Sequence, residues 1–268
     1  MGLFRSTRGH AGRFTSRVEE RAGGIEITES DGVRALHIDT ATVQSAMKLS
    51  APNDLQLTYS RGIMSCLVFG LPLRDVLVVG LGGGSIPKFI HHYLPAMRTR
   101  VVEIDPQIIA VARLHFHLPP DDDRLQVILD DAAAYLPAHP HSAQLLVLDV
   151  FDGRGIPPEL YSQVFFDHAA AVLGDSGLLA VNLWGSDRNF DVYLQRIEHS
   201  FGGQVLVMPT GRPGNIVVFG FRRPPADLRW STLRERARLL QMRYPIEFLE
   251  FVERLRDNNH STSNRLII

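Results

Sequence analysis

This sequence of 268 residues contains a single cysteine, Cys66. One cysteine excludes a disulfide within the chain and any metal site built from cysteine ligands. The residues around it, MSCLVFG, are apolar, so we expect a buried and inert thiol. His91, His92, His115 and His117 have no further ligands at a suitable spacing, and we therefore expect no metal.

Long apolar segments and an excess of charge of one sign are also absent. No apolar run approaches the length of about 20 residues that spans a membrane, and no signal peptide is visible. Lys and Arg together number 28 and Asp and Glu 29, so the formal net charge is −1. We therefore expect a cytoplasmic protein that binds neither nucleic acid nor membrane.

The N-terminal segment differs from the rest of the chain. Residues 1–23 contain five arginines and show little apolar periodicity, so we expect a mobile tail. Gly2 and Ser6 fit the pattern for N-myristoylation, but such short patterns often match by chance. An arm that packs on a partner subunit is the preferred interpretation.

Residues 24–70 predict a small β-rich module with a linking helix. Apolar and polar residues alternate on both sides of Asp31-Gly32, which is a strong hairpin signal. The apolar segment LTYSRGIMSCLVFGLP that follows is predicted to be helical. The module leads into the larger part of the chain.

Residues 71–268 predict a Rossmann-like α/β domain. Apolar strands such as DVLVVG and AQLLVLD alternate with helical segments such as PQIIAVARLHF. Continuous apolar strands separated by helices indicate a doubly wound, mostly parallel sheet that is covered on both faces. The segment 231–257 predicts one or two amphipathic helices at the end of the domain.

A glycine-rich loop follows the first of these strands, in the stretch VLVVGLGGGSIPKF. Ligands of open α/β sheets bind beyond the carboxyl ends of the strands, and glycine lets a ligand approach the main chain. A Walker phosphate loop is excluded because no Gly-Lys-Ser/Thr follows, and Ser85 occupies the sixth position of the dinucleotide fingerprint. A tight turn without a ligand is the alternative interpretation.

Acidic residues end the next three strands. Glu103 follows the glycines by about twenty residues, where a carboxylate can accept both ribose hydroxyls. Asp131 ends the third strand, where it could accept a hydrogen bond from an adenine amino group, and Asp149 and Asp152 follow the fourth. Each acid alone could be a helix cap. Together they indicate a nucleoside site of the S-adenosylmethionine type.

These motifs resemble the core of the spermidine synthases, the polyamine aminopropyltransferases. The resemblance extends from about residue 24 to residue 221 and rests on VLVVGLGGGSIPKFI, VVEIDPQIIAVAR, LDDAAAYL and LVLDVFDGRGIPPELYSQVFF. It implies a small β-domain, a catalytic domain like that of S-adenosylmethionine-dependent methyltransferases, and a homodimer or higher homo-oligomer. The implied substrates are decarboxylated S-adenosylmethionine, or S-adenosylmethionine itself, and a small-molecule amine acceptor.

The resemblance also implies roles for individual residues. Asp149 takes the position of the catalytic acid, and Asp152 that of the second aspartate in the family's Asp-Ser-Ser-Asp motif. Tyr59 falls where the family places a side chain of the substrate site. The residues implied to bind the nucleoside co-substrate are Gln44, Gly80, Gly82, Gly84, Glu103 and Asp131.

The amine side departs from the family pattern. Gly83 stands in place of an aspartate that binds the amine of the aminopropyl group, Arg61 in place of a glutamate, and Gly211 in place of a tyrosine. A dicationic diamine needs carboxylates, because buried ammonium groups without partners are very costly. We therefore expect an acceptor other than plain putrescine, with Arg61 repelling an ammonium group.

Three interpretations stay open on the sequence alone. The preferred one is an aminopropyltransferase-family enzyme with an altered acceptor. The second is a methyltransferase that uses S-adenosylmethionine, in which Gly83 leaves room and Arg61 pairs with the methionine carboxylate. The third is a catalytically silent protein that binds the nucleoside.

Overall fold

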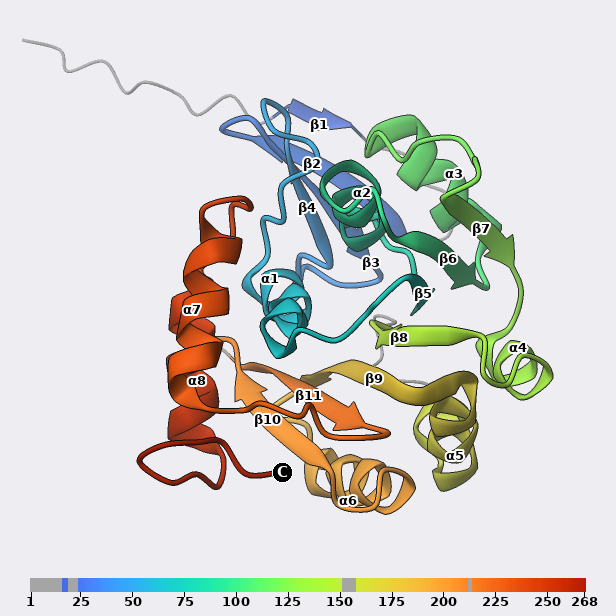
Figure 1. Cartoon of the computed structure of the whole chain (residues 1–268). Helices are drawn as coiled ribbons and strands as arrows, with labels where there is room; N and C mark the ends of the chain where they lie inside the picture. The colour runs from blue at the N-terminus through green and yellow to red at the C-terminus, as the bar shows by residue number, and fades with distance from the viewer. Residues whose placement is uncertain (1–15, 19–23, 151–157, 212–213) are drawn as a thin grey trace, which may run out of the picture.

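The computed structural model of the chain describes residues 16–18, 24–150, 158–211 and 214–268. It contains a small antiparallel sheet near the N-terminus and a large mixed sheet flanked by helices (Figure 1). The predicted Rossmann-like α/β fold, preceded by a β-rich module, is confirmed.

The small sheet has the strand order β1-β2-β3-β4. Asp31 and Gly32 have φ angles of 52° and 73°, as a two-residue hairpin turn requires, and the predicted hairpin is confirmed. The strands are β1 (Ser16–Val18), β2 (Ile25–Ser30), β3 (Val33–Ile38) and β4 (Ser45–Lys48).

β1 lies within the segment 1–23, for which the sequence predicts a mobile tail. Residues 16–18 instead pair antiparallel with β2, so the prediction is wrong for these three residues. The edge of β2 presents backbone groups that a further strand can pair with. The rest of that segment, with Gly2 and Ser6, lies outside the described residues.

The large sheet has the strand order β10-β11-β9-β8-β5-β6-β7. β11 is antiparallel to both of its neighbours, and all other adjacent pairs are parallel. The chain runs outward from β5 to β7 and then returns to β8, so the order reverses between β5 and β8. The strands are β5 (Asp75–Val79), β6 (Arg98–Glu103), β7 (Leu125–Leu129), β8 (Ala143–Leu148), β9 (Leu173–Trp184), β10 (Val205–Pro209) and β11 (Asn215–Phe221).

Helices cover both faces of this sheet because successive strand residues point to opposite sides (Figure 1). Val76 and Val78 of β5 join a buried cluster with one set of helices, whereas Leu77 and Val79 join a cluster with the other set. The first set is α1 (Thr58–Met64), η1 (Ser65–Phe69), α2 (Ser85–Tyr93), α3 (Pro106–His115), α7 (Trp230–Gln241) and α8 (Phe248–Asn258). The second set is α4 (Ala132–Ala138), η2 (Pro158–Tyr161), α5 (Gln163–Val172) and α6 (Phe190–Ser200).

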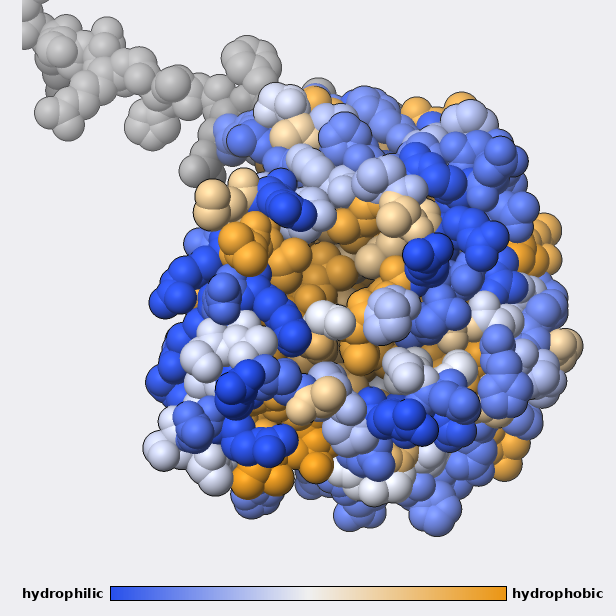
Figure 2. Space-filling model, in the orientation of Figure 1, coloured by the Kyte–Doolittle hydropathy of each residue, from blue (hydrophilic) through white to orange (hydrophobic). Residues whose placement is uncertain are grey.

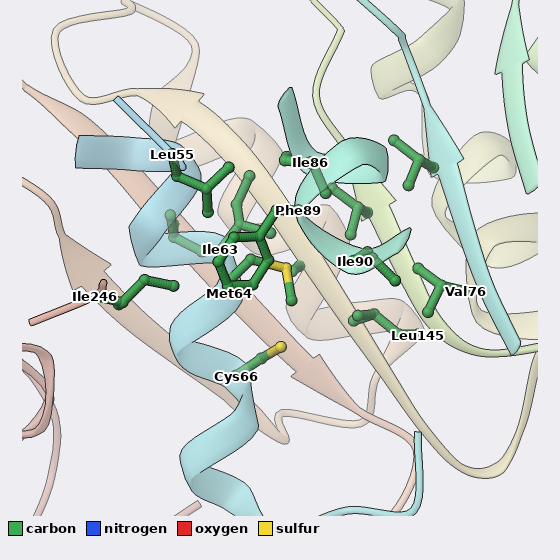
Figure 3. Close-up of a cluster of buried hydrophobic side chains, with 14 of the residues drawn as sticks. Leu55, Ile63, Met64, Cys66, Val76, Ile86, Phe89, Ile90, Leu145 and Ile246 are labelled. Carbon is green, nitrogen blue, oxygen red and sulfur yellow. The ribbon is translucent and has the colours of Figure 1, made fainter. Parts of the chain in front are cut away.

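The N-terminal module and the large sheet share one core. Ile27 and Met47 of the module belong to the same buried cluster as Phe89 of α2, and Figure 3 shows the part of that cluster where α1, α2, β5 and β8 meet. Lys88 Nζ donates to the carbonyl of Phe116 (2.5 Å) and contacts Met47 Sδ (3.2 Å). Burial lowers the pKa of Lys88 to about 8. Because the two parts share this cluster, the boundary near residue 70 separates a β-rich segment from an α/β segment and does not separate two cores.

The surroundings of Cys66 agree with the sequence interpretation. The thiol is fully buried, as predicted, and burial raises its pKa to about 12. None of the helices in the described ranges is long and apolar enough to cross a membrane. Figure 2 shows one face of the molecule, with hydrophobic residues gathered in a central hollow and hydrophilic residues around it.

Candidate functional site

A cavity of about 840 Å³ lies beyond the carboxyl ends of the parallel strands, at the point where the strand order reverses. The loops after β5, β6, β7 and β8 form one part of its wall. The β3–β4 connection, the starts of α1, α2 and β11, the end of β9, η2 and the residues after β10 form most of the rest. Its volume is in the range of small-molecule sites.

The glycine loop, residues 80–84, lines part of this cavity. Gly80 has φ 91°, and a Cβ at this position would lie 2.4 Å from the carbonyl oxygen of Asp149. Only glycine therefore allows β5 and β8 to end side by side there. Gly80 and Gly82 line the cavity, whereas Gly84 begins α2 and does not. Of the three glycines predicted to bind the nucleoside, two are in position to do so.

Glu103 connects the glycine loop to the end of β6. Its Oε2 accepts from the main-chain N–H of Leu81 (2.9 Å), and its Oε1 accepts from that of Asp105 (3.0 Å). Burial raises the pKa of Glu103, although these backbone hydrogen bonds favour the charged form and lower it. Each carboxylate oxygen can accept more than one hydrogen bond, so each can also accept one from a ribose hydroxyl.

Asp131 lines the cavity at the end of β7, beside Asp130. Its Oδ1 accepts from the main-chain N–H of Ala133 (2.8 Å), which makes it the N-cap of α4. The capping role that the sequence left as an alternative is therefore present. It occupies one carboxylate oxygen of a side chain that also faces the cavity, so the two roles are compatible.

Asp149 follows β8 on the opposite side of the glycine loop from Glu103. Asn182 Nδ2 donates to Asp149 Oδ1 (2.9 Å). Burial raises the pKa of Asp149 to about 6, while hydrogen bonds from Asn182 and Tyr59 lower it. A carboxylate with this pKa is charged at neutral pH yet remains a competent proton acceptor.

Tyr59, from the N-terminal part of the chain, lies between Gln44 and Asp149. The Tyr59 hydroxyl lies between two acceptors, the main-chain oxygen of Gln44 (3.1 Å) and the Asp149 carboxylate, and can donate its one proton to either. Burial and then the Asp149 carboxylate raise the pKa of Tyr59 well above its usual range. Gln44 Nε2 donates to the carbonyl of Ile38 (3.3 Å), whereas its Oε1 is buried with no hydrogen-bond partner among the described residues.

Two further residues of this site, Asn182 and Asn215, were not identified from the sequence. Both line the cavity, and Asn215 Nδ2 donates to Asn182 Oδ1 (2.9 Å). The available signal was the asparagine in the otherwise apolar stretch LLAVNLW, because a buried amide in a strand needs polar partners. Asp152, the second predicted catalytic residue, lies outside the described residues.

Arg61 does not face the cavity, so the expectation that it meets the substrate is wrong. Its Nε contacts both carboxylate oxygens of Glu247 (2.9 Å each), and its NH1 donates to the carbonyls of Leu55 (3.1 Å) and Gln56 (2.6 Å). Tyr59 and Ser60 line the cavity, and the next residue along the helix points elsewhere. Arg61 therefore neither repels an ammonium group nor pairs with a carboxylate of the donor.

Gly83 adjoins a space that is already filled. A Cβ at this position would lie 2.6 Å from Ser45 Oγ and 2.9 Å from Phe116 Cδ1. Ser45 Oγ in turn contacts Ser85 Oγ (3.1 Å), and both serines line the cavity. Two hydroxyls, one from the start of β4 and one from the start of α2, therefore lie beside the position where the resemblance places a carboxylate.

We expect Gly83→Asp to destabilise the fold by about 1–3 kcal/mol, because the side chain must displace Ser45 and the buried ring of Phe116. Urea unfolding measures the effect. Gly214→Asp is the matched control, since a Cβ there meets nothing within 4 Å, and its effect should stay within about 0.5 kcal/mol. Equal stabilities of the two variants would show that the space beside Gly83 accommodates an acid.

No group of three or more His, Cys, Asp or Glu side chains in the part of the chain that the structure describes is placed to hold a metal ion. The site offers carboxylates, amides and hydroxyls around a cleft with apolar walls. Such an arrangement is suited to a polar, partly cationic small molecule, and its carboxylates are potential proton acceptors.

Comparisons with known proteins agree with this geometry. The sequence model of the spermine/spermidine synthase domain matches residues 56–197. The polyamine aminopropyltransferase of Chromobacterium violaceum is 37% identical over 244 residues, which is 91% of this chain and 94% of the relative.

Two solved structures share the fold. A spermidine synthase in complex with the transition state analogue AdoDATO superposes with a TM-score of 0.69 at 18% identity, covering 91% of this chain and 85% of the other. Human methyltransferase-like protein 13 in complex with SAH gives a TM-score of 0.61 at 24% identity, covering 78% and 96%.

Proposed function

Since this chain belongs to the spermine/spermidine synthase family, we propose that it transfers an aminopropyl group from decarboxylated S-adenosylmethionine to an amine acceptor. One observation carries the proposal. A single cavity has Glu103, suited to a ribose, on one side of the glycine loop and the partly buried carboxylate of Asp149 on the other. A nucleoside donor and a proton acceptor would thus meet in the same place.

The donor would bind along the glycine loop. Gly80 and Gly82 let it approach the main chain, Glu103 would accept its ribose hydroxyls, and Asp131 would accept from its adenine amino group. Gln44, which also lines the cavity, is the remaining residue assigned to the donor. The nucleoside-type ligands named for the two neighbouring structures support this assignment.

The reaction is a displacement at a carbon attached to a sulfonium. A bond forms between the acceptor nitrogen and the methylene carbon of the aminopropyl group, and the bond from that carbon to sulfur breaks. Sulfur leaves as the neutral thioether of methylthioadenosine. The attacking nitrogen loses a proton, which Asp149 would accept. Holding the two reactants in line provides much of the remaining rate enhancement.

The acceptor would be an amine other than plain putrescine. Gly83 and Gly211 carry no side chain where the family pattern has an aspartate and a tyrosine. Gly211 lines the cavity and has open space around it, so a larger acceptor than putrescine would fit there. The hydroxyls of Ser45 and Ser85 replace a charged partner beside Gly83.

The test is to incubate the purified protein with decarboxylated S-adenosylmethionine and a panel of mono-, di- and triamines, and to detect methylthioadenosine and the extended amine by mass spectrometry. We expect product with at least one amine, and slower turnover with putrescine than with the best acceptor. A putrescine rate on the order of one per second or more would contradict the acceptor assignment. Methyl transfer from S-adenosylmethionine would support the methyltransferase instead, and methylthioadenosine binding without turnover would support a silent protein.

The resemblance also supports a homodimer or a higher homo-oligomer. Light scattering of the purified full chain tests this, because one protomer has a mass of 30.0 kDa. A measured mass equal to that of one protomer at micromolar concentration would exclude a stable dimer.

A further inference from the structure

Asn215 and Asn182 form a chain of hydrogen bonds that ends on Asp149. Asn215 Nδ2 donates to Asn182 Oδ1 (2.9 Å), and Asn182 Nδ2 donates to Asp149 Oδ1 (2.9 Å). Asn182 is only 6% exposed and lies between the buried Val181 and Leu183. A buried amide in an apolar strand is costly unless its hydrogen bonds are made, so this chain satisfies a specific requirement.

The register of the large sheet places the three side chains next to one another. Val181 of β9 pairs with Leu148 of β8, so Asn182 lies beside the residue that follows β8, which is Asp149. Asn215 pairs with Trp184 and is therefore a diagonal neighbour of Asn182 on the same face. The two asparagines of this hydrogen-bond chain are thus held on strands and not on flexible loops.

Thr210 binds Asn215, at the end of the hydrogen-bond chain that is furthest from Asp149. Its main-chain N–H and its Oγ1 both donate to the carbonyl oxygen of Asn215 (2.9 Å each), and Thr210 is itself buried. These contacts hold the start of β11 against the end of β10. The main chain of Asn215 is therefore held in place, and its side chain extends from there to Asn182.

The direction in which these hydrogen bonds are donated determines which group of the Asn182 amide faces Asp149. An asparagine side chain can present either its NH₂ group or its oxygen to a neighbour. Because Asn215 donates to Asn182 Oδ1, the NH₂ group of Asn182 must face Asp149. Without Asn215, Asn182 could turn its oxygen toward the carboxylate, and two acceptors would then oppose each other.

We propose that Asn182 and Asn215 are positioning residues for the transfer reaction: by binding Oδ1 of Asp149 they fix the orientation of the carboxylate that meets the acceptor amine. This inference rests on the proposed function only in giving Asp149 an amine to meet. The donated hydrogen bond also opposes the effect of burial, which favours the neutral acid. The titratable groups that face Asp149 among the described residues are Tyr59 from α1 and Tyr161 from η2, and both are neutral phenols at working pH.

The test compares Asn182→Ala, Asn215→Ala and the native chain by the pH dependence of kcat/KM and by carbon-13 NMR titration of the Asp149 carboxyl group. Loss of the donor raises the pKa of Asp149, so we expect activity at pH 6.5 to fall about tenfold in Asn182→Ala and to recover as pH rises. Asn215→Ala, at the start of a strand, should shift the profile in the same direction by less. Methylthioadenosine affinity should stay within about twofold of the native value in both.

Asn259→Ala is the matched control. Asn259 makes hydrogen bonds to the main chain of Val207 and Leu255, so its loss destabilises the fold without touching Asp149. Its pH profile and its Asp149 titration should be those of the native chain.

An unchanged Asp149 titration in a folded Asn182→Ala variant would overturn the inference. If Asn182→Ala does not fold, Asn215→Ala takes its place in the test. An unchanged Asp149 titration in Asn215→Ala would then overturn the inference. Absence of turnover in the native chain would contradict the proposed function and not this inference, because the NMR titration needs no substrate.

Discussion

Asp149→Asn is expected to lower turnover about 10²–10⁴-fold, which is the usual contribution of a positioned acid–base group. Asparagine keeps the size of the side chain and an oxygen that can accept the hydrogen bond from Asn182, but it cannot take up a proton at neutral pH. Affinity for methylthioadenosine should therefore stay within about a factor of three. Calorimetry and product detection on the same preparation measure the two effects.

The pH dependence of the native enzyme provides an independent check on this role. Because the pKa of Asp149 is raised to about 6, the proton-accepting form is depleted as the pH falls through 6, and kcat/KM should fall with it. The Asp149→Asn variant should lose this acidic limb. Loss of methylthioadenosine binding in Asp149→Asn, or undiminished turnover, would show that Asp149 holds the nucleoside or has no part in proton transfer.

Asp152→Asn should have a milder effect than Asp149→Asn, because Asp152 lies further along the chain from the end of β8. The same turnover assay compares the two variants. A larger loss in Asp152→Asn would reassign the proton acceptor.

Glu103→Ala is expected to weaken methylthioadenosine binding by about 2–4 kcal/mol, because two charge-assisted hydrogen bonds to the ribose are lost. This corresponds to roughly 30- to 1,000-fold in the dissociation constant. Calorimetry measures the loss. An affinity equal to that of the native chain would contradict the ribose assignment.

A second ligand separates the ribose contact from the support that Glu103 gives to the loop. Glu103 also accepts from the N–H groups of Leu81 and Asp105, so its removal disturbs the glycine loop as well. Methylthioadenosine that lacks the 2′-hydroxyl should lose affinity for the native chain but little further affinity for Glu103→Ala. Equal losses for both proteins would show that Glu103 acts on the loop alone.

The sheet, its helices and the strand-end acids that line the cavity could be predicted from local sequence patterns. The alternation in β5 sends Val76 and Val78 to one core cluster and Leu77 and Val79 to the other, and this pattern alone implies helices on both faces. Acids at strand ends must meet at one edge because parallel strands end together. Glu103 and Asp149 were therefore found without coordinates.

The amine side could not be predicted in the same way, because it depends on contacts between distant parts of the chain. Arg61 stands beside Tyr59 in the sequence, but its partner is Glu247, and that ion pair turns it away from the cavity. Gly83 suggested an empty place, yet Ser45 and Phe116 fill it. No local pattern reports either contact.

The sequence by itself therefore determined the fold class, the place of the cavity and the acids at the strand ends, since each follows from periodicity and strand order. Only the tertiary structure decided what surrounds Asp149. Asn182 and Asn215 follow it in the sequence by more than thirty residues, and the sheet register brings the Asn182 amide to its carboxylate and the Asn215 amide to Asn182. The raised pKa of Asp149 has the same origin, because burial and hydrogen bonding are properties of the assembled site and not of the residue.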